Sequence, residues 1–383
     1  MLTCRHHRSG LSMRISLNKL FLSIGLVLSV VSSPAVILFD TADPSHNTTP
    51  PTGVLANSGW QLQGKWGGFL GTPIGQNHFI AATHVGGSVG QTFTLNGVAH
   101  TTTASHADPN SDLTIWQVTP PFRDWAQLYT NNNEVAKRFV VFGRGTKRGA
   151  PIEVGGPLTP VTKGWLWGDY DGVQRWGENT VEDVLDTDGN PHSVIISGIA
   201  AVGPLLRATF DPNGGPNEAA LSVGDSSGAI FINDGSTWRL AGINYAVDGP
   251  YNTSATGAGF MGAIFDEGGL YKGGENKWTL TPDLPTAQGS AFFVTRISAR
   301  IDWIRSIIGD PGVPNPAPVL EYTTALNSTF TEDTTATFDP TNILFRTPKT
   351  AEPRFFRIRA TQPIEITSLT LDGPNLLLTC RYK

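Results

Sequence analysis

The chain has 383 residues, of which 39% are hydrophobic, so it is long enough to bury one large core or two smaller ones. Only 15% of its residues are charged, whereas 43 are glycine and 27 are proline, a composition typical of many short strands joined by tight turns. The net charge of −5 and the lack of a basic block predict no nucleic-acid partner.

Residues 1–35 have the composition of a secretory signal peptide. Basic residues precede an apolar run at 20–31, and Ser33 and Ala35 supply small residues at the two positions that signal peptidase reads. Cleavage after Ala35 leaves Val36 as the mature N-terminus of a protein that is secreted, periplasmic or at the cell surface, without stable insertion in a membrane. The alternative is an uncleaved anchor helix, for which the apolar run is short.

Residues 36–58 read as an extended lead-in, and a β-rich region follows at 59–309. Apolar runs at 79–82 and 138–142 and an alternating run at 113–118 predict strands, and Asn96-Gly97 predicts a hairpin turn. Isoleucines at helical spacing predict one helix at 298–308, with Ser298 as its cap and Gly309 at its end.

A proline-rich stretch at 310–318 predicts a linker to a small β module at 319–383. The best strands of this module are expected at 355–359, 364–371 and 376–382. Cys380 lies in the last of these runs, and the other cysteine, Cys4, falls within the predicted signal peptide. We therefore expect Cys380 to be a buried and inert thiol without a disulfide partner.

Three short segments carry residue types that suit nucleophilic catalysis. The apolar run 79–82 leads into His84, Asp112 opens the alternating run, and Ser226 lies in a glycine-flanked turn. A serine hydroxyl needs a base to take its proton, and imidazoles titrate near neutrality. A buried carboxylate fixes the imidazole tautomer, and backbone N–H groups in a tight turn stabilise an oxyanion. Each segment alone also fits a structural role, so the hypothesis rests on their combination.

In the order His, Asp, Ser, these segments resemble the chymotrypsin/trypsin-like serine proteases. Ala-Thr-His at 82–84, Asp-Leu at 112–113 and Gly-Asp-Ser-Ser-Gly at 224–228 are similar to the family's motifs. Val-Thr-Arg-Ile-Ser at 294–298, followed by Asp-Trp-Ile at 302–304, is similar to the strand and helix that close the family's fold. This last match carries no catalytic residue, so a chance active-site motif would not produce it.

The resemblance implies an all-β fold of two packed six-stranded antiparallel β-barrels with a short C-terminal helix. It makes His84 the general base, Asp112 the residue that orients it and Ser226 the nucleophile. The N–H groups of Gly224 and Ser226 form the oxyanion hole, which Asp225 supports from behind. The implied enzyme is a monomeric endopeptidase that hydrolyses a protein or peptide substrate through an acyl-enzyme, with no cofactor and no metal.

The resemblance also maps a substrate pocket onto this sequence. Ala220, six residues before the nucleophile, corresponds to the pocket floor, and Tyr245 and Val247 belong to the opposite wall. None of these residues is acidic, so we expect a preference for apolar or small side chains over Arg or Lys. Asp248 is the one acid close enough in sequence to change this expectation.

Departures from the family leave alternatives open. Ser227 replaces a family glycine directly after the nucleophile, where an unusual backbone angle would make a side chain costly. Ser227 is also an alternative nucleophile, although only Ser226 lies midway between the two flanking glycines. The family's usual disulfides are absent. A secreted pseudoprotease that binds or adheres without turnover is therefore a second hypothesis, and an esterase with the same triad is a third.

The N-terminus also departs from the family's animal zymogens, in which a new ammonium group pairs with the Asp before the nucleophile. No Ile/Val-Val-Gly-Gly activation site precedes Trp60, and Val36 lies further upstream than the family spacing. We therefore expect no separate activation cleavage, and we expect Asp225 to be paired within the fold by backbone N–H groups.

Other patterns favour structural interpretations. Asp186, Asp188 and Asn190 lack the glycine and glutamate that a calcium loop of the EF-hand type needs. His78 is close to His84 in sequence, but no acidic or cysteine residue nearby completes a metal site. Five tryptophans are expected to pack in the core or on the surface of a β-barrel rather than to form a sugar-binding platform: Trp60, Trp66, Trp165, Trp167 and Trp176.

Overall fold

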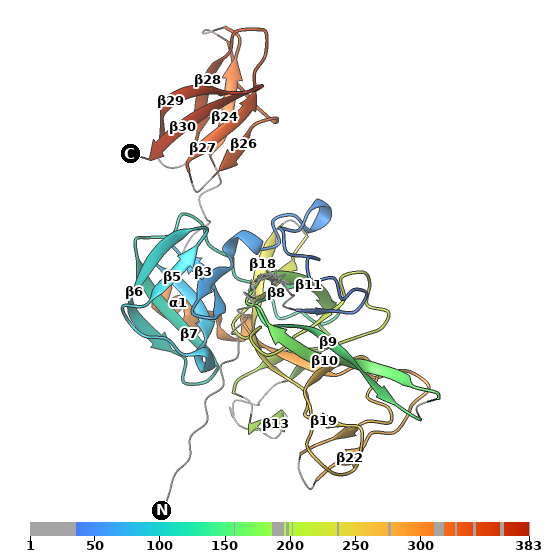
Figure 1. The fold of residues 1–383 in the computed structure, drawn as a ribbon. Helices are drawn as coiled ribbons and strands as arrows, with labels where there is room; N and C mark the ends of the chain where they lie inside the picture. The colour runs from blue at the N-terminus through green and yellow to red at the C-terminus, as the bar shows by residue number, and fades with distance from the viewer. Residues whose placement is uncertain are drawn as a thin grey trace, which may run out of the picture. The chain divides into compact units, whose positions relative to one another are not determined.

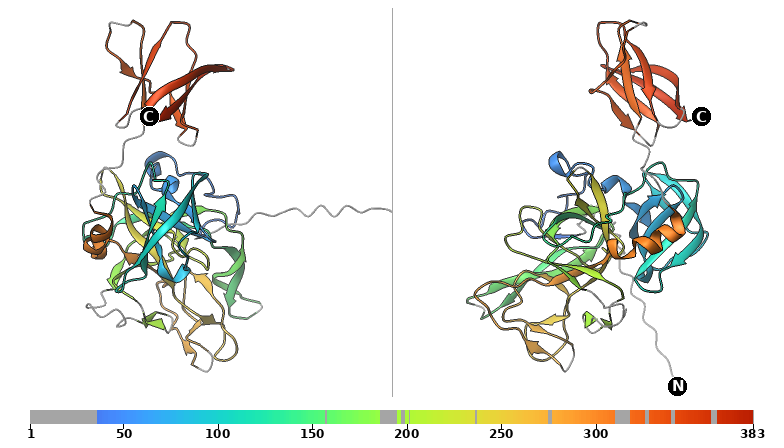
Figure 2. Two further views of the ribbon diagram at one scale, coloured as in Figure 1. Left: turned by 90° about the vertical axis from the view of Figure 1, so that its left-hand side faces the viewer. Right: turned by 180° about the vertical axis from the view of Figure 1, so that it is seen from behind.

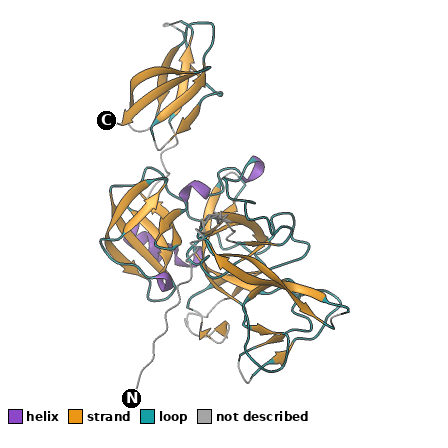
Figure 3. Cartoon of the chain, viewed as in Figure 1, coloured by secondary structure: helices purple, strands orange, loops and turns teal. Residues whose placement is uncertain are grey.

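The computed structural model describes residues 36–156, 158–185, 202–235, 237–274, 277–309, 318–325, 328–339, 342–360 and 364–382, with the backbone of 195–196 and 199–200. The predicted signal peptide, most of the predicted linker and the turn at 186–190 lie outside the described residues. Strands, drawn in orange in Figure 3, dominate the described chain. Among the described residues, the one α-helix is α1 (Ile301–Ile308), and the other helical segments are 3₁₀ turns. The predicted all-β class with a short C-terminal helix is confirmed.

Six strands close into an antiparallel barrel in the order β2-β3-β4-β7-β6-β5 (Figure 1). Aromatic side chains fill it: the Phe79 and Phe93 rings stack with their centroids 4.1 Å apart. The predicted turn joins β5 to β6, with φ of +49° at Asn96 and +80° at Gly97, as a two-residue hairpin turn requires. The strands are β2 (Gly64–Trp66), β3 (Phe69–Gly75), β4 (His78–Ala82), β5 (Thr92–Leu95), β6 (Val98–Ala107) and β7 (Leu113–Thr119).

The second β unit is a seven-stranded antiparallel sheet curved into a half-barrel, in the order β11-β8-β17-β18-β23-β15-β12. It differs from the closed six-stranded ring that the resemblance implied, because it has seven strands and remains open, with β11 and β12 at its two edges. The strands are β8 (Arg138–Gly143), β11 (Arg175–Thr180), β12 (Asp183–Leu185), β15 (Leu205–Thr209), β17 (Ala229–Asn233), β18 (Trp238–Val247) and β23 (Ala291–Arg296).

A shared hydrophobic cluster joins the two β units and the helix. Ile80 of the barrel, Phe142 of the half-barrel and Ile304 of α1 belong to it, and all three are fully buried. The helix lies against the cyan barrel in Figures 1 and 2. It begins after the 3₁₀ turn η4 (Ser298–Arg300), and Ser298 is not its cap, because the Ser298 hydroxyl donates to the Glu134 carboxylate instead.

The chain between β8 and β17 contains a long hairpin of β9 (Thr146–Val154) and β10 (Val161–Tyr170). Its strand β10 also pairs with β20 (Gly262–Ile264). Near the N-terminus, η1 (Gly53–Leu55) and η2 (Trp60–Leu62) are single 3₁₀ turns. The remaining short pairs are β1 (Ile37–Leu38) with β16 (Ala219–Ala220), β13 (Ile195–Ile196) with β14 (Ile199–Ala200), and β21 (Tyr271–Lys272) with both β19 (Tyr251–Asn252) and β22 (Thr279–Leu280).

The C-terminal module consists of two antiparallel sheets around a core of its own. Leu320, Phe345, Leu378 and Cys380 are buried together in that core. Burial raises the pKa of the Cys380 thiol to about 11, which agrees with an inert side chain. One sheet contains β24 (Val319–Thr323), β25 (Thr331–Glu332) and β28 (Phe355–Arg359), and the other β26 (Thr337–Asp339), β27 (Leu344–Pro348), β29 (Ile364–Asp372) and β30 (Asn375–Tyr382).

Candidate active site

His84 and Asp112 meet at the end of the barrel strands β4 and β7. Ala82 pairs with Leu113 across the ladder, so the residues just beyond these strands lie side by side. The 3₁₀ turn η3 (Thr83–Val85) carries His84, whose Nδ1 lies 2.5 Å from Asp112 Oδ2, and the His84 backbone N–H donates to Asp112 Oδ1 at 2.9 Å. The Asp112 carboxylate is buried, whereas 39% of the His84 side chain is exposed. The carboxylate therefore fixes the ring at Nδ1 and leaves Nε2 toward solvent.

The loop with Ser226 is held in a tight turn after β16. The Asn244 side-chain amide donates to the carbonyls of Asp225 at 2.8 Å and Phe142 at 2.9 Å, and the Ser227 N–H donates to the Asn244 carbonyl at 3.0 Å. Gly228 has no room for a side chain, because a Cβ there would lie 2.0 Å from the Phe142 carbonyl oxygen. These contacts leave Ser226 half-buried at the tip of the turn.

The backbone N–H groups of this turn fall into two classes. Those of Asp225, Ser227 and Gly228 donate to carbonyl oxygens within the fold. Those of Gly224 and Ser226 make no hydrogen bond to any described residue. Gly224 adopts φ of +94°, which favours glycine. The two N–H groups expected to form the oxyanion hole are thus the two in this turn that have no acceptor among the described residues.

The Ser226 hydroxyl makes no hydrogen bond within the part of the chain that the structure describes, and neither does His84 Nε2. The structure therefore brings His84 and Asp112 into direct contact but shows no hydrogen bond from Ser226 to His84. Catalytic hydrogen bonds are often long or poorly aligned in the absence of substrate and tighten in the complex.

Asp225 lies fully buried behind this turn, and burial raises the pKa of its carboxyl group to about 6. The N–H groups of Gly145 and Ser222 each donate to it at 2.7 Å, as expected for pairing within the fold. The backbone N–H of Val36 also donates to it, although sequence spacing had placed Val36 too far upstream. Strand β1 explains this contact, because its pairing with β16 brings the buried Val36 next to the loop.

The residues predicted to form the substrate pocket lie in different environments. Ala220 pairs with Ile37 of β1 and is buried with Phe210 in an apolar cluster. Tyr245 lies beside the catalytic pair, with its ring centroid 6.0 Å from that of His84. Burial, and then the charge of Asp112, raise the pKa of Tyr245 above its ordinary value. Val247 packs against the buried core of the half-barrel.

Asp248, the acid that could have altered the pocket's charge, is paired within the fold with a lysine that it shares with Glu267. Its carboxylate lies 3.0 Å from the Lys272 ammonium and accepts a hydrogen bond of 3.1 Å from the Ala291 N–H. Lys272 also contacts Glu267 at 3.1 Å, and Tyr251 donates to the same glutamate at 2.6 Å. This network could not be predicted from the sequence, because Lys272 lies far from Asp248 along the chain.

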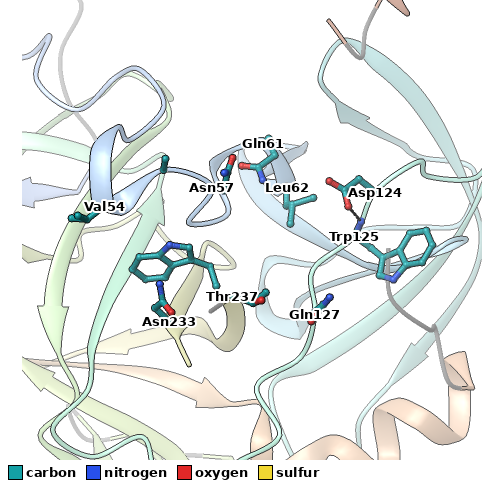
Figure 4. A pocket seen from close by; sticks show the side chains of 11 residues that line it. Val54, Asn57, Gln61, Leu62, Asp124, Trp125, Gln127, Asn233 and Thr237 are labelled. Atoms are coloured by element: carbon teal, nitrogen blue, oxygen red, sulfur yellow. Dashed lines mark hydrogen bonds between the residues drawn. The ribbon is translucent and has the colours of Figure 1, made fainter. Parts of the chain in front are cut away.

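A separate cavity of about 380 Å³ lies between residues 54–62, the connection at 124–127 and the β17–β18 hairpin. Figure 4 shows the side chains around it, among them Asn57, Asp124 and Asn233. Its lining does not include His84, Asp112 or Ser226. Among the described residues, no group of three or more His, Cys, Asp or Glu side chains has the arrangement of metal ligands. In the same set of residues, no helix is both long and apolar enough to cross a membrane.

Comparisons with known proteins find likeness only among solved structures. No protein-family model matches the chain, and no curated protein matches it. The chain is similar to neuropsin, a serine protease expressed in the limbic system of mouse brain, at 13% identity and a TM-score of 0.38, over 65% of this chain and 95% of that one. It is also similar to kallikrein-related peptidase 10, at 16% identity and a TM-score of 0.35, over 68% of this chain and 99% of that one.

Proposed function

We propose that this chain is a secreted serine endopeptidase that hydrolyses peptide bonds through an acyl-enzyme. The observation that carries the proposal is the pairing of His84 with the buried Asp112, at 2.5 Å between Nδ1 and Oδ2. A carboxylate at Nδ1 holds the proton there, so that Nε2 has a free electron pair and can act as a base. The composition of residues 1–35 supports secretion.

In the acylation step, Ser226 Oγ attacks the carbonyl carbon of the substrate while His84 Nε2 takes the hydroxyl proton. The carbonyl oxygen becomes an oxyanion, and the N–H groups of Gly224 and Ser226, which have no acceptor among the described residues, donate to it. The imidazolium then gives its proton to the amine as the C–N bond breaks. This leaves the acyl group as an ester of Ser226.

Deacylation repeats these steps with water as the nucleophile. His84 Nε2 takes a proton from water as the water oxygen attacks the ester carbon, and the same two N–H groups stabilise the second oxyanion. The proton then returns to Ser226 Oγ as the carboxylic acid product leaves. Asp112 stays ionised throughout and stabilises the imidazolium in both halves of the cycle.

The proposed specificity is for apolar or small side chains. Ala220, which corresponds to the floor of the family's pocket, is an apolar residue in an apolar cluster. The carboxylate of Asp248 is already bound by the Lys272 ammonium and the Ala291 N–H, so it is held within the fold rather than left as a lone acid for a basic side chain of the substrate. A peptide library that varies the residue before the cleaved bond tests this, and strong cleavage after Arg or Lys would contradict it.

A second candidate function is a secreted binding module without turnover. The observation that favours it is the Ser226 hydroxyl, which makes no hydrogen bond to His84 or to any other described residue. A fluorophosphonate probe separates the two candidates, because it reacts with an activated serine and leaves an inactive one unmodified. Comparison of matched amide and ester substrates separates the peptidase from an esterase with the same residues.

A further inference from the structure

One hydrogen bond links the loop of Ser226 directly to the strand that carries His84. The backbone N–H of Ala82 donates a hydrogen bond to the Ser227 hydroxyl, with 2.9 Å between the nitrogen and Oγ. Ser227 and Ala82 are 145 positions apart in sequence, and they are 0% and 1% exposed. No other described hydrogen bond connects residues 78–85 to residues 222–228.

The backbone conformation of Ser227 is strained for any residue that carries a side chain. Its φ is +66°, in the left-handed region that glycine adopts readily and that other residues adopt with strain. A glycine would therefore suit the turn better, and it would keep the backbone hydrogen bond from Ser227 to Asn244. What a glycine lacks is the hydroxyl, so the bond to Ala82 is the specific contribution of a serine at this position.

On the barrel side, this hydrogen bond is made by the backbone just before the catalytic pair of His84 and Asp112. Ala82 is the last residue of β4, and the next residue, Thr83, donates its N–H to the Asp112 carbonyl at 3.0 Å. His84 follows, and both its N–H and its ring are bound to the Asp112 carboxylate. The chain from Ala82 to His84 is thus fixed to Asp112 on one side and, through the Ala82 N–H, to the loop of Ser226 on the other.

We propose that Ser227 is a positioning residue that sets the separation between His84 Nε2 and Ser226 Oγ. This inference rests on the proposed function, since it concerns the proton transfer between those two atoms. Ser227 touches neither the substrate nor the reacting atoms. It acts through Ala82, two residues before the base, while it is itself adjacent to the nucleophile. Reaction rate depends steeply on such alignment, because proton transfer requires the two heavy atoms within hydrogen-bond distance.

The test compares Ser227→Gly with Ser227→Ala. Both lose the hydroxyl, and the glycine variant also relieves the strain of the left-handed backbone, so it is the variant expected to fold well. We expect kcat on a short peptide to fall about tenfold in both, with KM within about twofold, since an unpaired buried N–H lets the strand shift. The rate of fluorophosphonate labelling should fall in parallel, whereas the low-field NMR signal of the proton between His84 and Asp112 should persist.

The matched control is Ser290→Ala, which removes another buried serine hydroxyl that accepts a backbone N–H, from Ile264 at 3.1 Å. It should lower the thermal midpoint without changing kcat. The assays are run at a temperature well below the thermal midpoint of each variant. The positioning role is wrong if Ser227→Gly then keeps the kcat and the labelling rate of the original protein. If the original protein is not labelled at all, the proposed function fails first. If the label is on Ser227 itself, the roles of both serines are reversed.

Discussion

Asp112→Asn is the substitution for which the structure gives the clearest expected result. The carboxylate uses one oxygen for the His84 backbone N–H and the other for the ring Nδ1. An asparagine can keep the first bond with its carbonyl oxygen, but its NH₂ group then faces Nδ1. Because an NH₂ group only donates, Nδ1 must become an acceptor and the ring proton must move to Nε2. Nε2 can then no longer take the proton from Ser226.

The expected loss is about 10⁴-fold in kcat, the scale on which the wrong tautomer acts in serine proteases. This corresponds to about 5 kcal/mol at about 1.4 kcal/mol for each factor of ten. The effect on folding should be far smaller, because asparagine has nearly the volume of aspartate and still accepts the His84 N–H. KM should change little, since Asp112 is buried behind the ring and does not reach the substrate.

The assay is steady-state hydrolysis of a short peptide, together with circular dichroism to compare the folds. Asp124→Asn is the control, because it removes an exposed carboxylate outside the catalytic pair and should leave kcat unchanged. Retention of more than about a tenth of the original kcat by Asp112→Asn would refute the assignment of His84 as the base, given the expected scale of loss.

Three further predictions follow from the buried carboxylates and the chain ends. Burial raises the pKa of Glu218 from 4.5 to about 8, so the folded chain holds an extra proton in that window and stability falls as pH rises through it. In thermal midpoints measured from pH 4 to 9, Glu218→Gln should remove the part of this slope that lies above the Asp225 pKa of about 6, whereas the exposed Glu352→Gln should leave it unchanged. N-terminal sequencing of active secreted protein should give Val36, since cleavage there places an ammonium against the buried Asp225 carboxylate, and a start well after Val36 would contradict this. Truncation after Pro311 should leave kcat/KM on a short peptide and the thermal midpoint unchanged, because the C-terminal module has its own core; an insoluble or inactive truncation would show the opposite.

The sequence predicted the parts of the fold that depend on neighbouring residues. The Asn96-Gly97 hairpin follows from local turn preferences, and the helix at 301–308 follows from the spacing of its isoleucines. The predicted cap of that helix, Ser298, was wrong, because the Ser298 hydroxyl donates to the Glu134 carboxylate, 164 positions away in sequence. Capping preferences consider only residues near the helix end, so they cannot predict that a distant carboxylate will bind the hydroxyl of the cap residue.

The same limit applies to the candidate site. His84, Asp112 and Ser226 could be identified as candidates from the sequence, since each lies at the end of a recognisable strand or in a recognisable turn. The donation from Val36 to Asp225 could not be identified, because it depends on the pairing of β1 with β16. This pairing joins Ile37 to Ala220, and the whole six-stranded barrel lies between them in sequence. The cost of Ser227 was anticipated from its position in the motif, but its bond to Ala82 required the two β units to be placed together.

The most direct test of the proposed function is to identify the residue that a fluorophosphonate probe modifies in the secreted protein. We predict a single labelled peptide with the adduct on Ser226, no labelling of Ser226→Ala, and strongly reduced labelling of His84→Ala, because the imidazole activates the hydroxyl. Ser227→Ala should still be labelled at Ser226, more slowly. Absence of any adduct in the folded, secreted protein, or an adduct on Ser227 that survives Ser226→Ala, would contradict the assignment of Ser226 as an activated nucleophile.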